Sequence, residues 1–188
     1  MPFGRHTHLV EYARLAIWWA KGKPIQGRPN PAPYEIKIGT VKKYAAQFCL
    51  PIFVETGTLR GDMIAAVQDA CEEVYSIEVD SALWKQAIER FRGKNHIKIL
   101  QGDSRVILPQ ILLEISRPCL FWLDAHTDTD SPVLAELDAI ANSDLKRYVI
   151  LIDDARMFRG NGWPNLSDVM RALPECHIEN DMIVKAMA

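Results

Sequence analysis

The sequence predicts an α/β protein with a doubly wound, mostly parallel sheet. Five short apolar runs recur after residue 50, and amphipathic patterns of helical length separate them. The runs are apolar on both faces, as strands of a parallel sheet covered on both sides must be. Strands that alternate with helices, joined by right-handed crossovers, give this class of sheet. The predicted strands are 52–55, 74–78, 97–100, 119–123 and 148–152.

Helical patterns fill the intervals between these runs, and their first residues are suitable for helix starts. Asp80 can cap one helix, and Pro132 stands where another begins. The tail 177–185 is expected to form an antiparallel hairpin that turns at Asn180 and Asp181, which brings the sheet to seven strands. The predicted helices are 61–71, 81–92, 104–116, 131–142 and, after a glycine-rich loop, 165–173.

Residues 1–50 are predicted to be a separate region of two helices and a linker. Residues 7–21 have the pattern of an amphipathic helix, 22–33 contains four prolines and is expected to be extended, and 35–48 returns to helical character. Trp18 and Trp19 extend the apolar face of the first helix. Packing of this region on the domain is the favoured interpretation; a lid over an acceptor site or a homodimer contact through the first helix is the alternative.

Composition excludes several classes of protein. The chain has 188 residues, the length of one ordinary domain, with 48% hydrophobic and 24% charged residues. A formal net charge of −2 argues against a nucleic-acid or anionic-membrane partner. Four cysteines lie far apart, without the spacing of a zinc or disulfide framework. No apolar run is long enough to span a membrane, and a cytoplasmic location is expected.

One glycine turn has the composition of a nucleoside site. An apolar run ends in Glu55, a turn with Gly57 and Gly61 follows, and a helical pattern begins directly after it. A dinucleotide fingerprint placed on Gly57 would need glycines where Glu55 and Arg60 stand. A carboxylate at this point would also repel a pyrophosphate, whereas it suits a ligand with an ammonium and a sulfonium. The motif therefore reads E-x-G-x-x-x-G.

Acids stand at the end of every predicted parallel strand. In open α/β sheets ligands bind outside the carboxyl ends of the strands, so these acids are expected to share one edge. A cluster of carboxylates is costly unless cations or hydrogen-bond donors satisfy it. The alternative is that each acid caps the helix that follows it. The acids are Glu55, Glu78, Asp103, Asp124 and the pair Asp153–Asp154.

This pattern resembles the S-adenosylmethionine (SAM) sites of class I methyltransferases over about residues 51–187. The resemblance implies a Rossmann-like SAM-binding domain at 51–188, with Glu55 facing the amino-acid end of SAM. Glu78, 21 residues after Gly57, would accept the ribose hydroxyls, and Asp103 the adenine amino group. The residues expected to bind the cofactor are Glu55, Thr56, Gly57, Thr58, Gly61, Glu78, Val79, Gly102, Asp103, Ser104 and Asp124.

The later acids predict a second site. Asp124 and the pair Asp153–Asp154 follow neighbouring predicted strands and could converge on Mg²⁺ or Mn²⁺. The arrangement is similar to that of catechol-type, metal-dependent O-methyltransferases, which implies that Asp124, Asp153 and Asp154 hold the metal and that Asp124 takes part in catalysis. His126 is a candidate general base. A surface histidine beside a helix start is an equally good interpretation of His126.

The expected function is therefore SAM-dependent methylation of a small hydroxylated acceptor, assisted by a divalent metal. A metal-dependent hydroxylase-like relative on the same fold is one alternative, and a non-catalytic nucleoside-binding module is another. The sequence does not identify the acceptor. No nucleic-acid or membrane partner is expected.

Overall fold

The computed structural model describes residues 31–160 and 162–187. The predicted helix 7–21 with Trp18 and Trp19, the homodimer contact assigned to it, and residues 22–30 of the linker lie outside this part. Within the described ranges, no helix combines the length and apolar character needed to cross a membrane.

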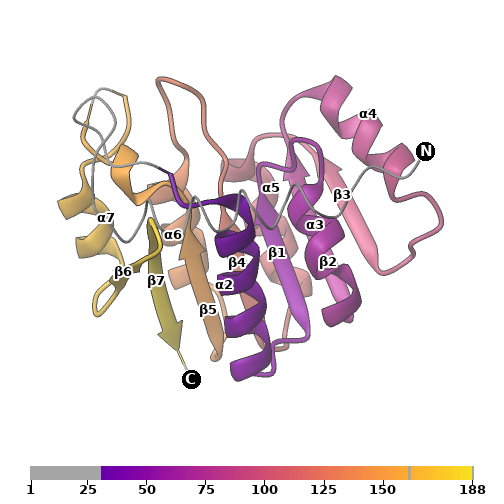
Figure 1. Cartoon of the computed structure of the whole chain (residues 1–188), viewed down its shortest axis with the longest axis horizontal. Coiled ribbons are helices and arrows are strands. Elements are labelled where there is room, and N and C mark those ends of the chain that lie inside the picture. Colours follow the sequence, from indigo (N-terminus) through magenta and orange to yellow (C-terminus); the bar gives the residue numbers. More distant parts are fainter. Residues whose placement is uncertain (1–30, 161, 188) are drawn as a thin grey trace, which may run out of the picture.

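The strands form a single seven-stranded sheet in the order β3-β2-β1-β4-β5-β7-β6 (Figure 1). The first five strands are parallel, and β7 runs antiparallel to both β5 and β6. The predicted sheet and its antiparallel C-terminal hairpin are confirmed. The strands are β1 (Ile52–Thr56), β2 (Glu73–Glu78), β3 (Ile97–Gln101), β4 (Cys119–Leu123), β5 (Tyr148–Ile152), β6 (His177–Glu179) and β7 (Met182–Met187).

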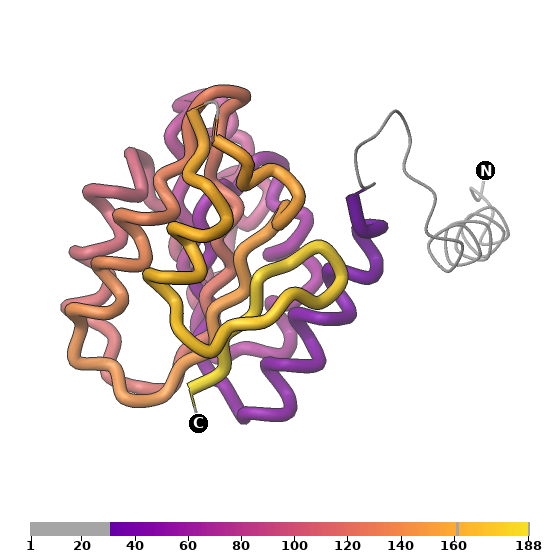
Figure 2. Tube along the Cα trace, turned by 90° about the vertical axis from the view of Figure 1, so that its left-hand side faces the viewer, coloured from indigo at the N-terminus to yellow at the C-terminus, as the bar shows by residue number. Residues whose placement is uncertain are grey.

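Helices cover both faces of the sheet in two layers (Figure 2). Buried side chains of α2, α3 and α4 share a cluster with one face, and those of α5, α6 and α7 share a cluster with the other. The helices are α2 (Tyr34–Gln47), α3 (Asp62–Val67), α4 (Ser81–Arg90), α5 (Ser104–Glu114), α6 (Val133–Ala141) and α7 (Leu166–Ala172), with the 3₁₀ turns η1 (Gln68–Ala70) and η2 (Ala155–Met157).

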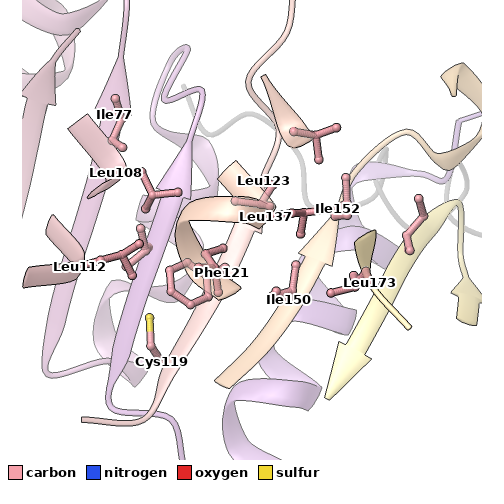
Figure 3. Packing of buried hydrophobic residues seen from close by; sticks show 14 of the residues in the cluster. Ile77, Leu108, Leu112, Cys119, Phe121, Leu123, Leu137, Ile150, Ile152 and Leu173 are labelled. Atoms are coloured by element: carbon pink, nitrogen blue, oxygen red, sulfur yellow. The ribbon is translucent and has the colours of Figure 1, made fainter. Parts of the chain in front are cut away.

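Strand side chains alternate between the two layers. Phe121 and Ile150 belong to the cluster with α5–α7, which Figure 3 shows together with Leu112 and Leu137. Their neighbours Trp122 and Leu151 belong to the cluster with α2–α4. Because β4 and β5 are apolar on both faces, they occupy the centre of the sheet. The polar residues that directly follow these strands, Asp124 and Asp153, therefore lie at the edge of the sheet where the parallel strands have their carboxyl ends.

Helix α2 joins the sheet domain through both apolar and polar contacts. Val41 and Tyr44 are buried in the cluster of the α2–α4 layer. The Tyr44 hydroxyl donates to Glu179 Oε2 over 2.8 Å, and Asn180 Nδ2 donates to Thr40 Oγ1 over 3.2 Å. These bonds tie α2 to the C-terminal hairpin. The first turn of α2 lies at the level of the carboxyl ends of the parallel strands (Figure 1).

Candidate functional site at the carboxyl ends of the strands

A cavity of about 510 Å³ opens where β1, β2, β3 and β4 end. Seven of the eleven residues predicted to bind a cofactor line it: Gly57, Glu78, Val79, Gly102, Asp103, Ser104 and Asp124. The other four, Glu55, Thr56, Thr58 and Gly61, are not part of its wall. The wall also contains Leu59 and Leu83, to which the sequence patterns gave no role.

Gly57 makes the sharp turn that opens the cavity. Its φ is +88°, which L side chains rarely adopt, and its N–H donates to the carbonyl of Ile77 over 2.9 Å. A Cβ at this position would lie 2.7 Å from the carbonyl oxygen of Asp124. The chain after β1 therefore passes between the tips of β2 and β4 only because residue 57 has no side chain.

Glu55 lies beneath this turn. Its side chain is 2% exposed, and Ser76 Oγ donates to its Oε2 over 2.6 Å. Burial raises the pKa of Glu55 to about 8, and the Ser76 hydrogen bond opposes that rise. Thr58 Oγ1 lies 2.6 Å from the same Ser76 hydroxyl. Through Ser76, Glu55 is linked to Thr58 in the turn that follows β1. The predicted contact of Glu55 with a ligand stays a prediction.

Glu78 has its carboxylate held by two backbone N–H groups. Oε2 accepts from Leu59 over 2.7 Å, and Oε1 accepts from Asp80 over 2.9 Å. The side chain is 5% exposed and lines the cavity. A carboxylate oxygen has more than one acceptor site, so each can still take a hydroxyl from a ligand. The orientation of Glu78 is set before any ligand arrives.

Asp103 fulfils both interpretations of the strand-end acids. As the N-cap of α5, it accepts from the N–H of Arg105 over 2.9 Å. Its other oxygen lies 3.0 Å from Arg105 Nη1, and Arg105 also pairs with Asp130. The same carboxylate lines the cavity. Capping the helix and facing the cavity are therefore compatible.

Asp124 and His126 lie where the cavity meets the tip of β5. Burial raises the pKa of Asp124 well above its usual range, Asp153 adds to that rise and Lys37 opposes it. His126 Nε2 lies 3.8 Å from Asp124 Oδ1 and 4.0 Å from Asp154 Oδ2. The two predicted catalytic residues are therefore neighbours in the cavity wall.

The ring of His126 rests against an aromatic side chain of the loop before α7. The ring centroids of His126 and Trp163 lie 4.8 Å apart. Trp163 is buried, and its indole N–H donates to the carbonyl of Thr127 over 3.0 Å. One side of the imidazole is therefore fixed by packing, while the side chain as a whole keeps 35% of its surface exposed.

The predicted metal site at Asp124, Asp153 and Asp154 does not fit the side chains present. Lys37 Nζ lies 2.5 Å from Asp153 Oδ2 and 3.0 Å from Asp154 Oδ1. In residues 31–160 and 162–187, no group of three or more His, Cys, Asp or Glu side chains is arranged to hold a metal ion. An ammonium group takes the place between the carboxylates that the sequence interpretation gave to Mg²⁺ or Mn²⁺.

Lys37 is the functional candidate that sequence reasoning missed. It shares a face of α2 with Val41 and Tyr44, at steps of four and three residues, and all three are buried. A lysine in an otherwise apolar stripe is a signal of a buried ion pair, because an unpaired buried ammonium is very costly. The partners, 116 and 117 residues away, could not be read from that signal.

Tyr34, one turn before Lys37, faces the same edge of the sheet. Burial raises the pKa of its phenol above the usual range, and Glu55, Asp62 and Asp124 act in the same direction. The side chain remains 40% exposed. The first turn of α2 therefore contributes two polar side chains to the acidic edge.

A further buried acid, Glu136 of α6, lies behind the cavity wall. It is 1% exposed, and neither carboxylate oxygen makes a hydrogen bond within the described part of the chain. Burial raises the pKa of Glu136 to about 7, and the nearby hydroxyls of Ser104 and Thr56 oppose that rise. Thr56 is thus placed by the structure beside Glu136 rather than in the cavity wall.

Comparison with known proteins identifies the fold. No family model and no curated protein matches the chain. The SAH-bound methyltransferase PaMTH1 of Podospora anserina is similar with a TM-score of 0.64 and 14% identity over 100% of this chain and 98% of that one. The O-methyltransferase TomG of Streptomyces achromogenes, in complex with SAM, is similar with a TM-score of 0.61 and 11% identity over 85% and 83%. The protein has the class I methyltransferase fold.

Proposed function

We propose that this protein transfers the methyl group of SAM to an oxygen of a small hydroxylated acceptor. The observation that carries the proposal is the cavity of about 510 Å³ at the strand ends, walled by Gly57, Glu78 and Asp103. The similar structures PaMTH1 and TomG are described with SAH and SAM bound. TomG is described as an O-methyltransferase, which favours an oxygen acceptor.

The residues of the cavity suit a sulfonium nucleoside. When bound, SAM supplies an electrophilic methyl group on a positively charged sulfur. Glu78, already oriented by two backbone N–H groups, accepts hydrogen bonds from the ribose hydroxyls. Asp103 accepts from the adenine amino group, and Gly57 lets the backbone approach the ligand closely. The net negative charge of the wall favours a cationic ligand.

His126 is the proposed general base. Its Nε2 would accept the proton that the acceptor hydroxyl gives up as its oxygen forms the bond to carbon. Asp124 and Asp154, at 3.8 Å and 4.0 Å from that nitrogen, stabilise the imidazolium that results. The rest of the rate enhancement comes from holding the two reactants in line, which needs no nucleophile from the protein.

No divalent metal enters this proposal, because Lys37 already bridges Asp153 and Asp154, two of the three carboxylates expected to hold it. The metal-dependent hydroxylase-like alternative loses its metal ligands for the same reason. The non-catalytic binding module differs from the proposed enzyme only in transfer, and a transfer assay separates the two.

Cofactor binding is tested by calorimetric titration with SAH. The wild-type protein should bind SAH, and Glu78→Gln should weaken binding at least about tenfold, or ~1.4 kcal/mol, because an amide cannot accept at both atoms. Glu114→Gln, at an exposed position of α5, is the matched control and should leave the affinity unchanged. Absence of SAH binding by the wild type would refute the proposal.

Transfer is tested with isotope-labelled SAM and a panel of catechols, sugars and small hydroxylated metabolites. A labelled product is expected from at least one acceptor, and His126→Ala should reduce its rate by roughly 10²–10⁴ while SAH affinity is retained. If SAH binds and no member of the panel is labelled, the binding-module alternative gains the stronger position.

A further inference from the structure

Lys37 and its two carboxylate partners form a buried charge group, in which Lys37 and Asp153 have no part in the proposed chemistry. The side chain of Lys37 is 9% exposed, and those of Asp153 and Asp154 are 5% and 14% exposed. A buried ammonium is stable only where acceptors replace its water shell, and here two carboxylates do so at 2.5 Å and 3.0 Å. The position of the cation is therefore specified by the fold.

Three of the four carboxylate oxygens of the pair accept hydrogen bonds from the protein itself. Asp153 Oδ2 and Asp154 Oδ1 accept from Lys37, and Asp153 Oδ1 accepts from the N–H of Asp154 over 2.7 Å. Asp154 Oδ1 also accepts from Arg156 Nη1 over 2.7 Å. Mg²⁺ requires oxygen ligands at about 2.0–2.1 Å in near-octahedral geometry, and the ammonium of Lys37 occupies the space between the two carboxylates in which such an ion would lie.

The remaining oxygen offers no place for a divalent ion either. Asp154 Oδ2 faces His126 at 4.0 Å. An ion bound there would lie close to both the ammonium of Lys37 and the guanidinium of Arg156, and like charges repel strongly in a half-buried site. Metal and lysine therefore exclude each other at the Asp153–Asp154 pair.

Helix α2 is anchored so that the lysine cannot easily withdraw. Val41 and Tyr44 of this helix are buried between α2 and the sheet. Thr40 accepts from Asn180, and Tyr44, one turn further along the same face, donates to Glu179, so two successive turns of α2 bind the C-terminal hairpin. The position of the Lys37 ammonium is therefore set by a helix that is itself held in place.

We propose that Lys37 is the resident cation of this edge of the sheet. It bridges Asp153 and Asp154 where a divalent ion would otherwise bind, Arg156 supplies the second positive charge at Asp154, and the site is independent of metal. As a statement about catalysis this inference rests on the proposed methyl transfer, but the exclusion of metal by Lys37 holds without it. Lys37 is thus a positioning residue that acts through the two carboxylates.

Mn²⁺ binding, followed by the electron paramagnetic resonance signal of the free ion, tests this inference. The wild type and Lys37→Arg, which keeps the charge, should leave that signal unchanged. Lys37→Ala should bind Mn²⁺ at least about tenfold more tightly than the wild type, and Lys37→Ala combined with Asp153→Asn should lose this gain. Tight Mn²⁺ binding by the wild type, or no gain in Lys37→Ala, would overturn the inference.

A second measurement needs no substituted protein. The thermal midpoint of the wild type in MgCl₂ should equal that in NaCl of the same ionic strength, and a rise specific to MgCl₂ would contradict the exclusion of metal. SAH titrations of the same preparation, with and without EDTA, keep the two proposals apart. Loss of all SAH binding counts against the methyl-transfer proposal alone, whereas SAH binding that disappears with EDTA counts against the role of Lys37.

Discussion

Two independent constraints act on Gly57. Its φ of +88° is unfavourable for any residue with a side chain, and a Cβ would overlap the carbonyl oxygen of Asp124 at 2.7 Å. Gly57→Ala should therefore lower the free energy of unfolding by roughly 2–4 kcal/mol, measured by urea denaturation. SAH affinity should fall with it, because the same turn walls the cavity.

Gly39 provides the matched control. It lies in the interior of α2, and an added Cβ would have no heavy atom within 4 Å. Gly39→Ala should raise the free energy of unfolding by about 0.5–1 kcal/mol, because alanine loses less conformational entropy in a helix. Equal effects of the two substitutions would show that backbone strain at Gly57 is not the cause.

Single residues differ in how far the sequence predicts their surroundings. The sequence predicts Glu78 and Asp103 at one site because Glu78 ends β2 and Asp103 closely follows β3, and the carboxyl ends of parallel strands share one edge of the sheet. The sequence does not predict the place of Lys37, because its partners belong to the turn after β5, more than a hundred residues away. The hydrogen bond from Ser76 to Glu55 is not predictable from local sequence either, because it depends on the register in which β1 pairs with β2.

Helix α4 begins at a residue whose side chain serves as its cap. Asp80 Oδ1 accepts from the N–H groups of Ala82 and Leu83 over 2.8 Å and 2.9 Å. Asp80→Ala should lower the free energy of unfolding by about 1 kcal/mol, whereas Asp80→Asn, which keeps the capping oxygen, should have a smaller effect. Chemical denaturation of both variants checks this, and equal losses would argue against the cap.

The elements themselves were largely predictable from local pattern. All five parallel strands lie within a residue of the predicted runs, since a strand buried on both faces has a distinct composition. The predicted helix 61–71 is correct only in part, because α3 ends at Val67 and continues as the 3₁₀ turn η1. Helix α6 begins at Val133, with Pro132 as its N-cap rather than its first residue.

The free energy of unfolding of the whole protein depends on pH through its buried acids. The pKa of Glu136 is raised from 4.5 to about 7, so the native state binds this proton more tightly than the unfolded state does. The stability contribution is complete below pH 4.5 and is lost as the pH rises through 7. At 1.36 kcal/mol per unit, the loss amounts to roughly 3 kcal/mol. Glu55, with a pKa of about 8, acts in the same sense.

Glu136→Gln should therefore be more stable than the wild type at pH 8 and should show a flatter stability curve between pH 5 and pH 8. Urea denaturation at several pH values measures this, with Glu114→Gln at an exposed position of α5 as control. A curve for Glu136→Gln that still parallels the wild type would assign the pH dependence to other groups.

The placement of β7 between β5 and β6 has a consequence for synthesis on the ribosome. The turn after β5 is fastened to Asp181, whose backbone carbonyl accepts from Ala155 over 2.8 Å and whose carboxylate accepts from Arg156. A nascent chain that has emerged only as far as β5 therefore exposes the edge of β5 that later pairs with β7. The turn after β5 also lacks its hydrogen bonds to Asp181 at that stage. The earliest described helix and the last strands must both be present before that end of the protein acquires its final shape.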